Sequence, residues 1–292
     1  MNAPLLIDAP IYKDFVLDDL RAWRNEGLRT ALLTLVQIDG RSPRPLGSQI
    51  AVAEDGRAVG AITGGCAERA LVLDALAAID RGQNHIELYG EGSRFRDIVL
   101  PCGSGLHVHF DVNLADETVD RVLADYHKRR IGSLQCGPFA HTYLPQCRLV
   151  VVGQGPVAVT VAQVAAQMEM AVEIFSPDTT VLRATGGRRL TGAADFDTGL
   201  LDSHTALAMI FHDHGFEPDI LRQAIESEAF FIGALGSRPT HERRLETLRA
   251  MGASAQQLAR IHGPIGLDVG AKTPPEIALS VVAQVVAAWR SQ

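Results

Sequence analysis

Apolar and polar positions follow one pattern in the first part of the chain and another in the second. Three segments of the first part carry apolar residues at helical spacing: 14–26, 66–81 and 115–130. Three apolar runs predict strands: 30–38, 85–89 and 105–112. Asp55-Gly56 separates two further apolar runs and predicts a hairpin, because glycine accepts the positive φ of a tight turn. Residues 1–130 are therefore expected to form a mixed α+β domain.

From Arg148 onward, strand-like and helix-like segments alternate. The apolar runs are RLVVV (148–152), AVEIF (171–175), ALAMIF (206–211) and AFFIGAL (229–235). A long final helix is predicted after Thr273, where Pro274 suits the first helical position and Glu276 completes a capping box. Such alternation is typical of a parallel sheet with helices on both faces. The predicted fold class is α/β, with a Rossmann-like, doubly wound parallel sheet domain over 148–292.

Between these halves, residues 131–147 (IGSLQCGPFAHTYLPQC) contain glycine and proline and show no sustained hydrophobic period. Short segments of this kind are typical of domain linkers. We therefore predict an interdomain linker here. Cys136 and Cys147 lie in or beside it and are assigned no function.

Composition narrows the class of protein. The chain has 292 residues, of which 47% are hydrophobic and 21% charged, as expected for two globular domains. Its net charge is -7 and its basic residues are scattered, which argues against a nucleic-acid partner. No segment approaches the roughly 20 apolar residues of a membrane helix, and no export signal is recognised, so we expect a cytoplasmic protein. Its four cysteines form no CxxC pair, which argues against structural disulfides or a zinc knot.

A glycine-rich turn follows the first strand of the second half. Gly153, Gly155 and Ala158 give the pattern G-x-G-x-x-A between an apolar strand and an amphipathic helix, which is the context of a dinucleotide-binding turn. Ser176 stands at the end of the next strand, where NAD enzymes carry an acidic residue, and Asp178 follows two positions later. Two alternatives stay open: NAD(P) binding, or a Rossmann scaffold that keeps its turn glycines for packing.

Two cysteines lie in loops rich in small residues. Cys66 stands in TGGCAE (63–68) just before a predicted helix, and Cys102 stands in PCGSG (101–105). A thiol at a helix N-terminus has a stabilised thiolate, and thiolates bind soft metals and carry sulfur. We therefore predict that both cysteines are metal ligands of one bound cofactor. The alternative is that each is a small buried core residue.

Further candidate site residues follow predicted strands of the second half. His212, Asp213 and His214 come directly after ALAMIF and are expected to hydrogen-bond a ligand at the carboxyl edge of the sheet. Ser237 and Arg238 precede a helix, where a capping hydroxyl and a guanidinium suit a phosphate. We also expect residues 262–268 to form an ordered loop over this edge, and Arg44 and Pro45 to complete a cleft from the first domain.

Taken together, the chain resembles the xanthine dehydrogenase accessory protein family (XdhC/CoxI). The stretches that carry the resemblance are SPRPLGSQIAV (42–52), GGCAE (64–68), PCGSG (101–105), HDHGFEPD (212–219), GALGSRPTHERR (233–244) and IHGPIGLDVGAKTPPEIALSVVAQV (261–285). The resemblance implies a chaperone that binds molybdenum cofactor, as molybdopterin or its nucleotide form, and supports its sulfuration and protection. It also implies delivery to a molybdoenzyme of the xanthine dehydrogenase or carbon monoxide dehydrogenase type, with a cysteine desulfurase as a second partner. A homodimer is expected as well, and it fits every function considered.

Two other functions compete with this one. An NAD(P)-dependent oxidoreductase would explain Gly153 and Gly155, but it leaves the cysteine loops unused and lacks a convincing acid or base beyond His212 or His214. A docking or assembly factor with a vestigial nucleotide fold would need neither cysteine. The chaperone hypothesis gives a role both to the cysteine loops and to the Rossmann domain. It predicts a protein that catalyses little by itself.

Overall fold

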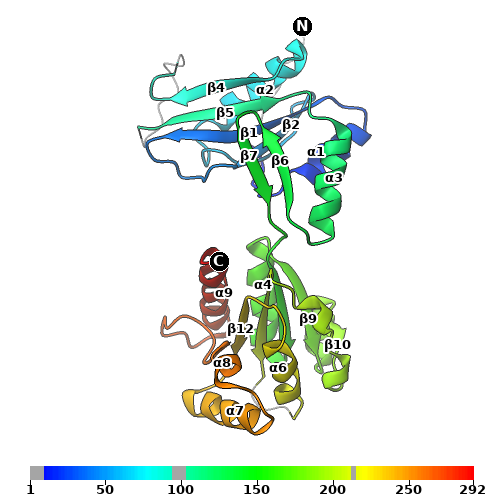
Figure 1. Cartoon of the computed structure of the whole chain (residues 1–292), viewed down its shortest axis with the longest axis vertical. Coiled ribbons are helices and arrows are strands. Elements are labelled where there is room, and N and C mark those ends of the chain that lie inside the picture. The colour runs from blue at the N-terminus through cyan, green and yellow to red at the C-terminus, as the bar shows by residue number, and fades with distance from the viewer. Residues whose placement is uncertain (1–9, 94–102, 212–214) are drawn as a thin grey trace. The chain divides into compact units, whose positions relative to one another are not determined.

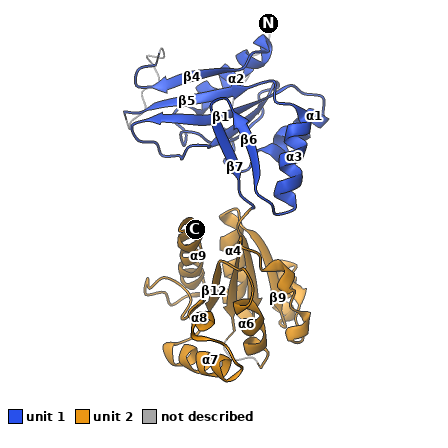
Figure 2. Cartoon of the chain, in the orientation of Figure 1, with its two compact units in different colours: residues 1–145 blue, residues 146–292 orange. Residues whose placement is uncertain are grey.

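The structure is a computed structural model that describes residues 10–93, 103–211 and 215–292. The chain divides between Pro145 and Gln146 into two compact units, coloured separately in Figure 2. Each unit has its own sheet and its own hydrophobic core. Among the residues described, no helix is long and apolar enough to cross a membrane.

The N-terminal unit is built on an antiparallel sheet with the strand order β3-β2-β1-β5-β4. Its strands are β1 (Thr30–Asp39), β2 (Gln49–Ala53), β3 (Ala58–Gly60), β4 (His85–Gly90) and β5 (Gly105–Asp111). Its helices are α1 (Leu17–Asn25), α2 (Glu68–Arg81) and α3 (Asp116–His127). Helix α2 packs on one face of the sheet, and α1 and α3 pack on the other. Every helix and strand predicted for this half is present (Figure 1).

The predicted linker over 131–147 is wrong for most of its length. Strands β6 (Gly132–Cys136) and β7 (Phe139–Tyr143) form an antiparallel hairpin there, with Gly137 at φ +58° in its turn. Leu134, Cys136 and Tyr143 are buried in the same core cluster as α1 and α3. The hairpin therefore belongs to the N-terminal unit.

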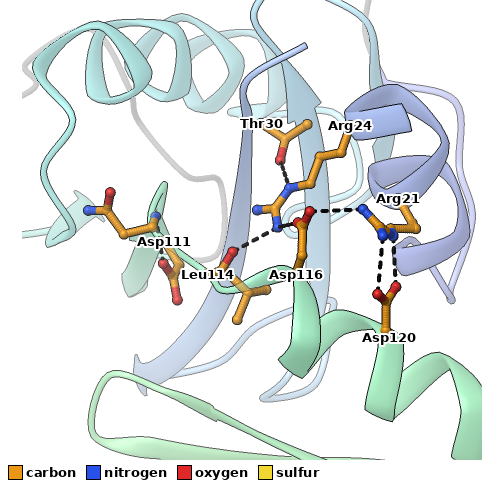
Figure 3. Close-up of polar contacts among 8 residues, drawn as sticks. Arg21, Arg24, Thr30, Asp111, Leu114, Asp116 and Asp120 are labelled. Atoms are coloured by element: carbon orange, nitrogen blue, oxygen red, sulfur yellow. Dashed lines mark hydrogen bonds and ion pairs between the residues drawn. The ribbon is translucent and has the colours of Figure 1, made fainter. Parts of the chain in front are cut away.

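Two arginines of α1 bind two aspartates of α3 (Figure 3). Arg24 donates to the Thr30 hydroxyl at 2.8 Å and to Asp116 at 2.7 Å, and its side chain is only 12% exposed. Arg21 bridges Asp116 at 2.9 Å and Asp120 at 2.7 Å. These contacts fix α3 against α1. The hairpin packs on these two helices, so the same contacts help to hold it in place.

We expect Asp116→Asn to weaken the N-terminal unit in a pH-dependent way. The hydrogen bond from Arg24 holds the pKa of Asp116 below its usual value. A lowered folded-state pKa gives stability that is present above the unfolded pKa, near 4, and is lost as the pH falls through the folded value. Because Asp116 is half exposed, the effect at pH 7 should stay below about 1 kcal/mol. Urea unfolding of wild type and Asp116→Asn at pH 7 and pH 3 measures this effect. An equal difference in the free energy of unfolding at the two pH values would contradict the prediction.

The C-terminal unit is built on a parallel sheet with the order β10-β9-β8-β11-β12-β13. Its strands are β8 (Arg148–Gly153), β9 (Ala171–Ser176), β10 (Arg188–Arg189), β11 (Thr205–Ile210), β12 (Phe231–Ala234) and β13 (Ile261–His262). Its helices are α4 (Gly155–Gln167), α5 (Thr179–Thr185), α6 (Glu217–Ile225), α7 (Arg238–Ala250), α8 (Ala255–Leu258) and α9 (Pro274–Arg290), with 3-10 turns at Ala193–Asp195 and Thr198–Leu200.

Counted from β8, this strand order is 3-2-1-4-5-6, the order of Rossmann domains. Helices α4 and α9 pack on one face of the sheet, and α6, α7 and α8 pack on the other. The predicted α/β fold with a doubly wound parallel sheet is confirmed. All six strands end at one edge, so the loops that follow them share that edge.

Candidate functional site

Three loops leave the same edge of the N-terminal sheet. Because the strands are antiparallel, β1 and β4 end at the edge where β5 begins, and the register pairs both Asp39 and Gly90 with Gly105. Strand β3 ends beside the start of β2, where Gly60 pairs with Ile50. The loops that carry Arg44 and Cys66 therefore leave this edge. Cys102 precedes β5 but lies outside the described residues, so its convergence with Cys66 stays a prediction.

Cys66 is exposed, in a loop that Glu68 holds together from inside. The Glu68 side chain accepts hydrogen bonds from the backbone of Thr63 at 2.6 Å, Gly64 at 2.9 Å and Gly65 at 2.7 Å, and from the Thr63 hydroxyl. A fourth amide, of Ile62, donates at 3.2 Å. Burial alone raises the pKa of Glu68, but the bonds from Thr63 and Gly65 outweigh it and lower the pKa overall.

The structure changes the role expected for the loop amides. The sequence predicted that amides at the start of the helix would stabilise a Cys66 thiolate. Helix α2 begins at Glu68, two residues later, and the amides of the loop donate to the Glu68 carboxylate instead. Sequence reasoning missed Glu68, although an acidic residue in the first turn of a helix is a recognisable signal. The result is a fixed loop that presents an exposed thiol.

Arg44 and Pro45 lie in the loop between β1 and β2. The Arg44 guanidinium pairs with Asp14 at 2.6 Å and lies over the Tyr12 ring, 5.1 Å from its centre. The Pro45 carbonyl accepts a hydrogen bond from the Ser48 hydroxyl at 2.8 Å. Both residues are thus tied to their own unit, and their predicted part in an interdomain cleft stays a prediction.

Gly153 and Ala158 of the glycine-rich turn in the C-terminal unit are closely packed, whereas Gly155 has open space beside it. A side chain at Gly153 would collide with the Ile210 carbonyl oxygen on the neighbouring strand β11. Gly155 adopts φ +73°, which only glycine takes readily, and Ala158 is fully buried against the sheet. These three residues shape the turn between β8 and α4, and their predicted contact with a ligand stays untested.

Ser237 and Arg238 start α7 at the carboxyl edge of the parallel sheet. The Ser237 hydroxyl caps the helix by accepting the Thr240 amide at 3.2 Å. Arg238 is exposed and, among the described residues, has no ion-pair partner. It is a free cation of the kind that the sequence predicted for a phosphate. His212, Asp213 and His214 lie outside the described residues, so their predicted contacts stay predictions.

A buried ion pair next to this edge escaped sequence reasoning. Arg244 Nε lies 2.5 Å from Glu217 Oε1, and the two side chains are only 5% and 11% exposed. Arg244 also donates to the Leu235 carbonyl at 2.7 Å. The ion pair joins the start of α6 to α7, and the hydrogen bond from Arg244 to Leu235 ties α7 to the short segment before it, which ends at Ser237. Nothing in the run HERR distinguishes the buried Arg244 from its exposed neighbour Arg243.

The loop after β13 is ordered, as predicted for residues 262–268. Its backbone is fixed to α9, because the Gly266 amide donates to Gln284 Oε1 at 2.6 Å and the Leu267 amide donates to the Ser280 carbonyl at 3.1 Å. The His262 ring stacks on Phe231 with 4.7 Å between centres. Since β13 runs parallel to β12, this loop leaves the same edge as Arg238.

No group of three or more histidines, cysteines or acidic residues suited to a metal occurs within 10–93, 103–211 and 215–292. A metal site formed by protein side chains alone is therefore not found in the described part of the chain. A molybdenum ion that is already coordinated by a dithiolene needs fewer ligands from the protein. Metal binding by Cys66 and Cys102 remains a prediction on that basis.

Comparison with known proteins identifies the family. Residues 23–90 match the model of the XdhC and CoxI family, and residues 149–285 match the model of the XdhC Rossmann domain. The chain is 32% identical over 279 residues to the molybdenum cofactor insertion chaperone PaoD of Escherichia coli, covering 89% of this chain and 83% of the relative. This chain belongs to the XdhC/CoxI family. The family resemblance expected from the sequence is confirmed.

Two further similar proteins cover most of the chain. One, a Bacillus subtilis protein described as a probable xanthine dehydrogenase component, is 23% identical over 87% of this chain and 92% of its own length. The crystal structure of a xanthine dehydrogenase from Bacillus halodurans superposes with a TM-score of 0.79 at 20% identity, over 94% of this chain and 96% of that one. The structural match concerns the fold alone.

Proposed function

We propose that this XdhC/CoxI protein binds molybdenum cofactor and inserts it into a molybdoenzyme of the xanthine dehydrogenase or carbon monoxide dehydrogenase type. The observation that carries the proposal is the exposed thiol of Cys66 on a loop fixed by Glu68, in a chain related over most of its length to a molybdenum cofactor insertion chaperone. Thiolates are good ligands for soft metals. A fixed but exposed thiol can take up such a ligand and release it to a partner.

We propose that the C-terminal unit binds a phosphate group. Arg238, at the start of α7, has no ion-pair partner within residues 10–93, 103–211 and 215–292, and guanidinium groups bind phosphate in a bidentate way. His212, Asp213 and His214 are proposed to hydrogen-bond the pterin, since they follow β11 closely in the sequence. Sulfuration with a cysteine desulfurase is proposed to use the exposed thiol of Cys66.

The oxidoreductase alternative gains no support from the structure. Ser176 is fully buried at the end of β9, and its hydroxyl accepts the Asp178 amide at 3.1 Å. The strand therefore ends without the acidic side chain that NAD enzymes place on the ribose. We propose the chaperone function in preference to it.

We expect the purified wild-type protein to retain molybdenum and pterin in near-stoichiometric amounts after anaerobic mixing with molybdenum cofactor and gel filtration. Cys66→Ser should retain at least about tenfold less, because a hydroxyl is a poor ligand for a soft metal. Cys147→Ser is the matched control, since Cys147 is a buried thiol of the other unit, and it should behave as wild type. No retention by wild type, or equal retention by wild type and Cys66→Ser, would contradict the proposal.

A further inference from the structure

The ring of His241 packs tightly against the loop after β13. A Cβ on Gly263 would come within 2.1 Å of His241 Nδ1 and 2.5 Å of its Cε1. Arg244, three residues further along α7, brings its Nη1 to 3.5 Å from the same Nδ1. Within residues 10–93, 103–211 and 215–292, the second ring nitrogen, Nε2, makes no hydrogen bond. Nδ1 is therefore held against the protein, and Nε2 is left for a ligand.

The position of Arg244 fixes which nitrogen of His241 carries the proton. A guanidinium only donates hydrogen bonds, so Nδ1 must accept from Arg244 and the ring proton must lie on Nε2. Arg244 cannot turn away readily, because its Nε pairs with Glu217 at 2.5 Å and its Nη2 donates to the Leu235 carbonyl at 2.7 Å. The buried ion pair thus sets the tautomer of His241.

His241 is uncharged at neutral pH. Burial lowers its pKa below the ordinary value for histidine, and the positive charge of Arg244 lowers it further. A charged ring would also turn an N–H on Nδ1 toward the Arg244 guanidinium, so that two donors would face each other. His241 therefore offers a neutral, directional N–H donor at Nε2.

We infer that His241 is a second phosphate-binding residue of the C-terminal unit, which donates its Nε2–H to an oxygen of the phosphate that Arg238 binds. The inference rests on the phosphate binding proposed above. Arg238 lies three residues before His241 on α7, and side chains at this spacing are neighbours on one helix face, about 5–6 Å apart at Cβ. Ionised phosphate oxygens accept hydrogen bonds, so a guanidinium and an N–H donor at this separation suit one phosphate.

The tautomer is tested first, with no ligand present. Long-range proton–nitrogen NMR spectra of the nitrogen-labelled, full-length protein distinguish a ring protonated at Nε2 from one protonated at Nδ1 or at both nitrogens. The signals that disappear in His241→Phe identify the residue. We expect His241 to be protonated at Nε2 alone at neutral pH. Protonation at Nδ1, or at both nitrogens, would overturn the inference.

Titration with inorganic phosphate then measures the contact itself. We expect saturable binding that shifts the His241 Nε2 signal, and about tenfold weaker binding by His241→Phe, which keeps a ring against Gly263 but has no donor. His241→Gln should recover most of the affinity, because its amide can donate from near the position of Nε2. His262→Phe is the matched control, since it keeps the stacking on Phe231 and should bind phosphate as wild type does.

This test fails separately from the proposed cofactor function. Cys66→Ser should bind phosphate as wild type does, because Cys66 belongs to the other unit. The inference is overturned by a wild type that binds no phosphate, by unchanged binding in folded His241→Phe, or by an equal loss in His262→Phe, whatever the retention of molybdenum.

Two further titrations distinguish the source of the phosphate. Molybdopterin carries a phosphate monoester and its nucleotide form carries a pyrophosphate, so glycerol phosphate and ADP serve as the two probes. We expect His241→Phe to weaken binding of at least one probe about tenfold, and the probe with the larger loss identifies the form that His241 recognises. Equal binding of both probes by wild type and His241→Phe would overturn the inference.

Discussion

Arg244→Ala should lower the free energy of unfolding of the C-terminal unit by about 3–5 kcal/mol. The substitution removes one partner of a buried ion pair and leaves the Glu217 carboxylate in a site where both side chains are nearly excluded from water. It also leaves the Leu235 carbonyl without the donor that lies 2.7 Å away. Urea unfolding followed by circular dichroism measures the change, with the two units fitted as separate transitions.

The adjacent Arg243 provides the matched control. It lies on the same helix and is exposed, so Arg243→Ala should change the free energy of unfolding by less than about 0.5 kcal/mol. The double substitution Arg244→Met with Glu217→Leu removes both charges and should recover most of the loss, because apolar replacements of buried ion pairs are often neutral. A loss below about 1 kcal/mol for Arg244→Ala would show that the pair is not important for stability.

The elements of the fold could be predicted because their signals are local. Strand β8, the turn at Gly153 and Gly155, and helix α4 are adjacent in the chain, and each shows in its own hydrophobic period and its glycines. The alternation of strands and helices then leaves few topologies, since parallel connections are right-handed and short. Short elements such as β10 and β13, with two residues each, carry no period and were missed.

The hairpin β6–β7 could not be predicted because its packing partners are distant and partly polar. Tyr143 of the hairpin donates to Gln49 on the five-stranded sheet at 2.9 Å, and Gln49 donates to Thr34 of the same sheet at 3.0 Å; all three residues are buried. A hydropathy pattern counts glutamine and threonine as surface residues, so it gives no sign of this contact. The glycine in its turn was therefore interpreted as part of a linker.

The two supporting charges of the candidate site were missed for the same reason. Glu68 and Arg244 are nearly inaccessible to solvent, yet sequence patterns assign charged residues to the surface. Their burial is possible only because the fold supplies partners: backbone amides for Glu68 and a carboxylate for Arg244. The residues that present a side chain, Cys66 and Arg238, were recognised, because motifs made of small residues mark them. What holds them in place becomes visible only in three dimensions.

The Cys66 loop should depend on Glu68 for its structure. In Glu68→Ala the amides of Ile62 and Thr63, both buried, lose their acceptor, and water does not replace it readily. Each unsatisfied buried amide costs about 1–3 kcal/mol, so we expect the N-terminal unit to lose about 3 kcal/mol or more. Urea unfolding of that unit measures the loss. Glu117→Ala is the control, because Glu117 is an exposed acid in the first turn of α3 and should matter little.

The same variant separates two roles of the loop. Cys66 is already exposed in the wild type, so complete alkylation by iodoacetamide is expected with and without Glu68, and access to the thiol should not change. If the loop must hold the thiol in a fixed position for the cofactor, retained molybdenum should nevertheless fall at least about tenfold at a temperature where the variant is still folded. Molybdenum retention equal to wild type in folded Glu68→Ala would contradict this. It would mean that Glu68 contributes to stability alone and that a mobile thiol is sufficient.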